Sequence, residues 1–189
     1  MKANLLLPGL LGLAQAAAAQ QPAPGLARHT VSVGVFGLAA TAGLEYEQRL
    51  GRHGALALQG ARYFSADYPG YQAALVGRYY FKKEGPGGLC LQLSVGAFTH
   101  KAQAQPAFYP GLPSTTETYA TTVHGQGGGL GLGYRWPLGA RLSLNTLVGI
   151  KAYVHDVNRL GGPGYVGDWY AAGQPGSVLD TQASLSYSF

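Results

Sequence analysis

The stretch Val178–Phe189, VLDTQASLSYSF, alternates between apolar and polar side chains almost without interruption. The mainly apolar positions are Leu179, Thr181, Ala183, Leu185, Tyr187 and Phe189, and the polar positions are Asp180, Gln182, Ser184, Ser186 and Ser188. This period of two indicates a β-strand with two different faces. A soluble protein rarely leaves such a strand at a sheet edge, because unpaired edges aggregate. A closed transmembrane barrel has no edge, one face toward lipid and one toward a polar interior, so the stretch predicts that fold.

The first residues of the chain predict export. Lys2 precedes an apolar segment, Leu5–Ala14, and a run of small residues, Ala16–Ala19, follows it. This is the pattern of a secretory signal peptide, and the apolar segment is too short for a membrane-spanning helix, which needs about 20 residues. We therefore expect a signal peptide at 1–19, a periplasmic leader at 20–28 and a barrel domain at 29–189.

The composition excludes several other classes. Charged residues make up 11% of the chain, with a net charge of +5, and the basic residues are scattered singly. A nucleic-acid partner, which usually requires a basic patch, is therefore not expected. The single cysteine, Cys90, provides neither a disulfide framework nor a multi-cysteine metal site, and we expect no cofactor or metal.

Eight segments of the chain alternate in this way. They are residues 29–37, 43–50, 55–65, 71–83, 89–103, 123–136, 141–157 and 178–189. The connections after the second, fourth and sixth segments are short, whereas 104–122 and 158–176 are long. Short periplasmic turns and longer extracellular loops are typical of outer-membrane barrels. We therefore predict an all-β, eight-stranded, antiparallel up-and-down transmembrane β-barrel with both termini in the periplasm.

Aromatic residues gather near the predicted periplasmic ends of the apolar faces. They are Tyr79, Phe81, Tyr134, Trp136, Tyr187 and Phe189. Aromatic side chains prefer the membrane interface at this depth. Arg62 disturbs the pattern, since strict alternation places it on the apolar face. Either Arg62 reaches the lipid headgroups from the outer rim, or a bulge changes the phase of its strand.

The architecture and the terminal strand resemble the small eight-stranded outer-membrane barrels of Gram-negative bacteria, the class of the OmpA transmembrane domain, OmpX and OmpW. The Gly- and Tyr-rich strands are also similar to outer-membrane barrels that are common in Bacteroidetes. In this class the barrel-assembly machinery reads the last strand. Gln182, Leu185, Tyr187 and Phe189 match that signal, and Ser184 stands where glycine is usual. The resemblance implies an integral outer-membrane protein in contact with lipid, lipopolysaccharide and the assembly machinery.

The polar faces predict the contents of the lumen. The charged residues expected there are Glu45, Glu47, Arg49, Arg78, Lys82, Arg135, Arg141, Lys151 and Asp180. An eight-stranded barrel is just wide enough for side chains to fill. Paired charges would plug it, because buried charges seek partners. The excess of basic residues leaves a narrow, anion-leaning channel as the alternative.

Glycine recurs at every second position from Gly125 to Gly133, on the face predicted to line the lumen. These glycines either make room for bulky inward groups such as Phe98, or line a cavity for a lipid tail or small hydrophobic molecule. The packing interpretation is the more usual one for glycine in strands.

Catalysis would need a constellation at the outer rim, for which the candidates are His100, His124, His155 and Asp156. Adjacent strand residues point to opposite faces, so His155 and Asp156 cannot form a lumenal dyad, and His100 and His124 are also expected on opposite faces. No spacing predicts a triad, and two histidines alone would be too few ligands for a metal. We therefore expect a non-enzymatic protein, with a lipid-modifying enzyme as the less favoured alternative.

The two long connections carry aromatic residues that could bind a partner. These are Phe108, Tyr109, Tyr165, Trp169 and Tyr170. Long loops on a rigid scaffold often carry binding sites, so the residues could contact an extracellular protein, a glycan or lipopolysaccharide headgroups. They could equally pack on each other or lie at the membrane interface. The sequence thus predicts a structural or adhesive scaffold, with binding or passage of a small hydrophobic molecule as the alternative.

Overall fold

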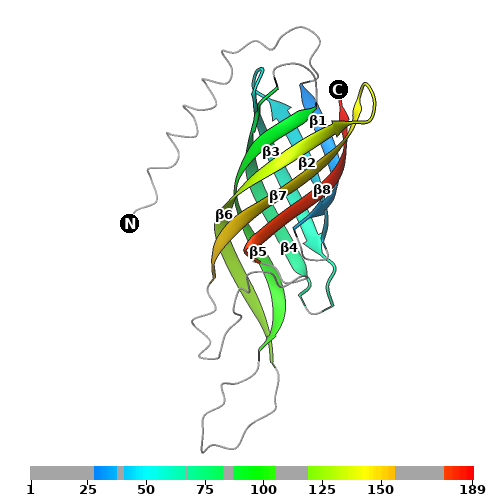
Figure 1. Ribbon diagram of the computed structural model, residues 1–189. Coiled ribbons are helices and arrows are strands. Elements are labelled where there is room, and N and C mark those ends of the chain that lie inside the picture. The colour runs from blue at the N-terminus through cyan, green and yellow to red at the C-terminus, as the bar shows by residue number, and fades with distance from the viewer. Residues whose placement is uncertain (1–27, 38–40, 67, 83–86, 105–118, 156–176) are drawn as a thin grey trace, which may run out of the picture.

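The computed structural model describes residues 28–37, 41–66, 68–82, 87–104, 119–155 and 177–189. Eight strands form a closed barrel in which each strand pairs with its sequence neighbours and β1 pairs with β8 (Figure 1). The strands are β1 (His29–Phe36), β2 (Thr41–Arg49), β3 (Gly54–Tyr63), β4 (Gly70–Tyr80), β5 (Gly88–Ala104), β6 (Tyr119–Pro137), β7 (Leu142–His155) and β8 (Leu179–Ser188). The predicted all-β, eight-stranded antiparallel barrel is confirmed.

The terminal strand closes the barrel. In the β1–β8 pairing, Val31 lies opposite Tyr187, and Val33 lies opposite Leu185. The backbone N–H groups of His29 and Phe189 each donate to the other's carbonyl, at 3.1 Å and 2.9 Å. The alternating strand β8 is therefore paired on both sides, with β1 and with β7.

The two faces of the wall are the reverse of those in a soluble protein. Large apolar side chains are exposed on the outside of every strand, including Val33, Leu44, Leu58, Leu93, Leu132, Val148 and Leu185. The charged and hydrogen-bonding side chains Glu45, Glu47, Gln59, Arg78, Gln92 and Arg135 are buried inside. Since apolar surface is stable outside only in an apolar solvent, this wall is built for lipid.

The strand lengths suit a bilayer. The ten residues of β3, at about 3.3 Å each and tilted by about 40°, rise roughly 25 Å along the barrel axis, which is the height of an outer-membrane apolar band. The strands β5 and β6, of 17 and 19 residues, project beyond the rest of the wall at the end away from the C-terminus (Figure 1). Among the described residues, no helix is long and apolar enough to cross a membrane.

Arg62 keeps the phase of its strand. The pairing of β3 with β2 and with β4 runs without a skipped residue past this position, and Leu56, Leu58, Arg62 and Phe64 are all exposed on the outside. The bulge is therefore excluded. The Arg62 guanidinium lies 5.5 Å from the Phe64 ring centroid and 5.8 Å from that of Tyr71, so aromatic faces flank the charge on the outer wall.

Candidate functional site

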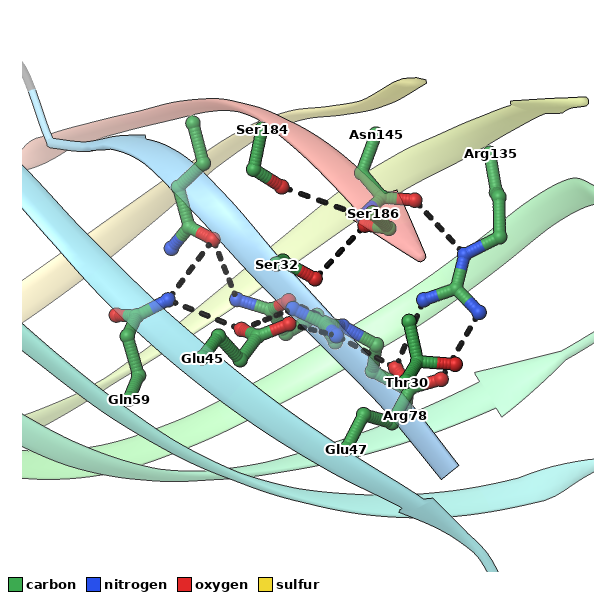
Figure 2. A network of polar contacts seen from close by, with 12 residues as sticks. Thr30, Ser32, Glu45, Glu47, Gln59, Arg78, Arg135, Asn145, Ser184 and Ser186 are labelled. Carbon is green, nitrogen blue, oxygen red and sulfur yellow. Dashed lines mark hydrogen bonds and ion pairs between the residues drawn. The ribbon is translucent and has the colours of Figure 1, made fainter. Parts of the chain in front are cut away.

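A charge cluster occupies the centre of the lumen. Glu45 and Glu47 project inward from β2 because they are two residues apart on one strand, and Arg78 reaches them from β4. Arg78 Nη1 and Nη2 donate to the two Glu45 carboxylate oxygens at 2.6 Å and 2.7 Å, and Nη1 also donates to Glu47 Oε2 at 2.6 Å. One guanidinium thus holds both carboxylates (Figure 2).

Glu47 is also bound from the opposite wall. Arg135, on β6, donates from Nη1 to Glu47 Oε1 at 2.9 Å and from Nη2 to Oε2 at 3.0 Å. The Tyr80 hydroxyl donates to the same Oε2 at 2.8 Å. Two carboxylates and two guanidiniums therefore neutralise one another, with every one of these side chains nearly inaccessible to solvent.

Neutral polar side chains complete the cluster. Gln92 accepts from Arg78 Nε at 2.8 Å, Gln59 donates to Glu45 Oε2 at 3.1 Å, and Asn145 accepts from Arg135 Nε at 2.7 Å. The Asn145 amide donates to Ser184 Oγ at 3.2 Å and to Ser186 Oγ. Ser184 thus helps to orient the amide that holds Arg135 (Figure 2).

Small hydroxyl residues on β1 and β8 make room for these long side chains. Thr30 Oγ1 lies 3.0 Å from Ser188 Oγ, and Ser32 Oγ lies 2.7 Å from Ser186 Oγ. Each pair consists of residues directly opposite in the β1–β8 register. The inward side chains at the β1–β8 seam are therefore short, and the long side chains from β2, β4 and β6 fill the space that they leave.

Arg49 is the exception to the charge balance. Its side chain is buried, and neither terminal nitrogen has a hydrogen-bond partner among the described residues. Its guanidinium carbon lies 4.6 Å from the Tyr80 ring centroid, and that of Arg135 lies 5.1 Å from the same ring. Arg49 is thus held by an aromatic ring rather than by a carboxylate.

A second ion pair lies farther along the lumen. Lys151 Nζ is 3.5 Å from Asp180 Oδ1, and Gln182 Nε2 donates to Asp180 Oδ2 at 3.1 Å. Gln59 Nε2 is 3.4 Å from Gln182 Oε1, which links this pair to the central cluster. Seven of the nine charged residues predicted for the lumen, from Glu45 to Asp180, therefore lie inside it.

Lys82 and Arg141 do not lie inside the lumen, so the prediction is wrong for these two residues. Both side chains are exposed, because β4 ends at Tyr80 and β7 begins at Leu142, so they lie past the last paired residues of the wall. Arg141 donates to the Tyr187 hydroxyl at 3.0 Å, and this hydrogen bond raises the pKa of the Arg141 guanidinium. Alternation predicts which face a residue occupies and not how deep it lies.

An aromatic group fills the lumen toward the projecting ends of β5 and β6. Tyr63, Phe98 and Val123 are buried together, with Tyr68 and Tyr153 packed against them. The Phe98 and Tyr153 rings meet edge to face with centroids 5.0 Å apart, although they come from β5 and β7. The strand between them is the glycine-rich β6, where Gly125 lies opposite Phe98 and Gly127 lies opposite Tyr153.

The space above the glycine run is taken up by backbone and side-chain atoms of the neighbouring strands. A Cβ atom at Gly127 would lie 2.0 Å from the Ala152 carbonyl oxygen, and one at Gly133 would lie 2.9 Å from Cys90 Sγ. At Gly131 it would lie 3.0 Å from Leu147 Cδ2. These contacts favour the packing interpretation of the run over a cavity for a hydrophobic ligand.

The histidine candidates lie apart. His100 is buried in the lumen, where its ring stacks on Phe98 at 5.4 Å, whereas His124 is exposed on the outer wall. In the described part of the chain, no group of three or more His, Cys, Asp or Glu side chains could hold a metal ion. The side chain of His155, together with Asp156, lies outside the described residues.

The remaining predicted residues lie partly outside and partly inside the described part of the chain. Phe108, Tyr109, Tyr165, Trp169 and Tyr170 lie outside the described residues, as do the signal peptide and residues 20–27. In the terminal strand, Leu185, Tyr187 and Phe189 are exposed on the outer wall, and Gln182 faces inward. The Phe189 ring stacks on His29 at 5.8 Å, so the last residue is fixed against the first strand.

Comparison with known proteins gives a likeness in structure but none in sequence. No protein-family model matches the sequence, and no match among the curated proteins is significant. The chain is similar in structure to the N-terminal β-barrel domain of Pseudomonas aeruginosa OprF, with 15% sequence identity and a TM-score of 0.45 over 87% of this chain and 100% of that one. The fold assignment stands on the strand pairing itself: the described chain is a closed, eight-stranded, antiparallel β-barrel with an apolar outside and a polar, filled inside.

Proposed function

We propose that this protein is an integral outer-membrane barrel that acts as a non-catalytic scaffold with a closed lumen. The observation that carries the proposal is the pairing of Glu45 and Glu47 with Arg78 and Arg135 across a lumen just wide enough for side chains. In such a network each of these charged groups is paired with another, so it is not available to bind a passing ion. The apolar outer wall supports residence in a bilayer.

The aromatic group supports a closed lumen at a second level. Tyr63, Phe98 and Val123 lie beyond the Lys151–Asp180 pair, so a solute would meet rings at one level and ion pairs at another. This argues against the alternatives of an anion-leaning channel and of passage for a small hydrophobic molecule.

Planar-bilayer conductance tests the closed lumen. The folded protein should give no steady openings, and a double variant, Phe98→Ala with Tyr153→Ala, should also stay closed because the central ion pairs remain. A wide-pored porin reconstituted in parallel shows that insertion is being detected. Steady openings of one defined size from the unmodified protein would overturn the proposal.

The scaffold role concerns the two long connections. Residues 105–118 join β5 to β6 and residues 156–176 join β7 to β8, and these four strands are consecutive in the wall. Both connections therefore leave from one side of the barrel, at the end away from His29 and Phe189. We infer that they present an adhesive surface to an extracellular protein or glycan.

Substitution of the loop aromatics tests adhesion. Trp169→Ser with Tyr170→Ser, and Phe108→Ser with Tyr109→Ser, should lower attachment of expressing cells to a protein- or glycan-coated surface. Trp136→Ser, on the outer wall near the other end, is the matched control. Unchanged attachment with both loop pairs at equal surface levels would remove the adhesive role and leave the barrel itself in place.

A further inference from the structure

A polar row crosses the outer wall near the end that carries the long connections. Arg62, Tyr71, Thr99 and His124 lie in direct register on β3, β4, β5 and β6, each paired with the next. Alternation points all four outward, and Arg62, Tyr71 and His124 are exposed. Lys101, the next outward residue of β5, is exposed as well. The apolar surface of the wall thus gives way to a polar, cationic border.

A groove lies just below this border. It has a volume of about 540 Å³, and the outward residues that line it include Tyr71, Ala73, Ala97, Gln126 and Val154. Ala73 pairs directly with Ala97, and Ala97 pairs with Gln126. One step deeper in the membrane, the same strands carry Leu75 and Val95. The groove exists because two alanines stand where the neighbouring levels carry larger side chains.

The charge above the groove has no carboxylate to neutralise it within the described residues. The carboxylate side chains in the described part of the chain are Glu45, Glu47 and Asp180. All three face the lumen and take part in the ion pairs described above. Arg62 and Lys101 are two strands and two residues apart, or about 12 Å between Cα atoms at ordinary strand spacings. Two cations at this separation, flanking Tyr71 and Thr99, suit an anionic headgroup with more than one phosphate.

We propose that this surface binds one lipopolysaccharide molecule, with the lipid A phosphates on Arg62 and Lys101 and an acyl chain in the groove over Ala73 and Ala97. The assignment rests on the proposed outer-membrane location, since the end of the barrel opposite His29 and Phe189 then lies in the outer leaflet. The cationic border meets the phosphorylated sugars, and the alanine floor meets the chain beneath them. The aromatic faces of Phe64 and Tyr71 shield the Arg62 guanidinium at the same boundary.

The experiment is a titration of the refolded chain in neutral detergent with purified diphosphorylated lipid A, read by native mass spectrometry. The unmodified protein should retain one lipid A per barrel. Arg62→Gln with Lys101→Gln should weaken binding at least tenfold, and Ala97→Leu, which fills the groove, should weaken it severalfold. Arg52→Gln, an exposed cation at the other end, and Ala183→Leu, an outward alanine on β8, should leave it unchanged.

Other outcomes overturn the site. Equal binding by all five proteins, equal binding of lipid A without phosphates, or displacement by an equal amount of phosphatidylglycerol would mean that no lipopolysaccharide site exists there. Pairing of barrels through the groove, lost in Ala97→Leu, would assign it to a second copy instead. Because the titration uses purified protein, its failure is separate from a failure of outer-membrane residence, which cell fractionation measures on its own.

Discussion

Arg135 on β6 and Glu47 on β2 form a two-pronged ion pair across the lumen, with nitrogen–oxygen distances of 2.9 Å and 3.0 Å. The two strands are not neighbours in the wall, so the contact joins opposite sides of the barrel. A paired charge of this kind is costly to break, because the partner left behind stays buried and uncompensated.

Glu47→Gln should lower the free energy of unfolding by about 3–5 kcal/mol, since it leaves Arg135 buried without a counter-charge. Urea unfolding in phospholipid vesicles, followed by tryptophan fluorescence, measures the change. Arg135→Met combined with Glu47→Leu should recover much of the loss, because Arg78 keeps its pair with Glu45. A double variant as unstable as the single one would contradict this account.

Arg49→Met should cost less than about 1 kcal/mol or should stabilise the barrel, because neither terminal nitrogen of the guanidinium has a hydrogen-bond partner in the described structure and methionine keeps the packing on Tyr80. Arg78→Met, which leaves Glu45 buried without a counter-charge, should cost several kcal/mol in the same assay. Equal losses for the two variants would show that Arg49 has a role that its contacts do not reveal.

Gly127→Ala should prevent or strongly impair folding, because the added Cβ would meet the Ala152 carbonyl oxygen at 2.0 Å and the Tyr153 Cα at 2.8 Å. Gly60→Ala is the matched control on β3, where a Cβ would meet no atom within 4 Å. The fraction of protein that resists protease after refolding into vesicles measures both. Normal folding of Gly127→Ala would show that β6 has room to move away from β7.

Phe189→Ser should reduce the level of assembled barrel in the outer membrane of expressing cells severalfold, if the assembly machinery reads the terminal aromatic residue. Phe64→Ser removes an equally exposed ring at the other rim and should have little effect on assembly. Refolding of purified Phe189→Ser into vesicles separates the causes. A matching defect there would trace the loss to the His29 stacking rather than to recognition.

Alternation was sufficient to predict the strand number and the face of most side chains, because a period of two is imposed by strand geometry, although it left the face of Arg62 open. The position of a residue along the barrel axis was harder to predict from the sequence. Lys82 and Arg141 have the inward phase but lie past the ends of β4 and β7, and β6 begins at Tyr119, four residues before the predicted start.

The ion pairs and hydrogen bonds inside the lumen could not be predicted from the sequence. Which guanidinium meets which carboxylate depends on the stagger of strands that lie across from one another. Gln59, Gln92 and Asn145 have the inward phase, and that phase was the only signal of their part in the cluster. The aromatic contact of Phe98 with Tyr153 likewise depends on two strands that never pair.

The transverse ion pair also bears on the order of folding. In an open sheet, β2 and β6 would stand four strands apart, roughly 19 Å at ordinary spacing, and Glu47 could not reach Arg135. The pair therefore forms only when the sheet curls far enough to bring β2 and β6 face to face, as they are in the closed barrel. Until the sheet curls, Arg135 and Glu47 cannot neutralise each other, and uncompensated charges are disfavoured in the hydrocarbon layer, so the neutralisation of this pair is coupled to the curling of the wall.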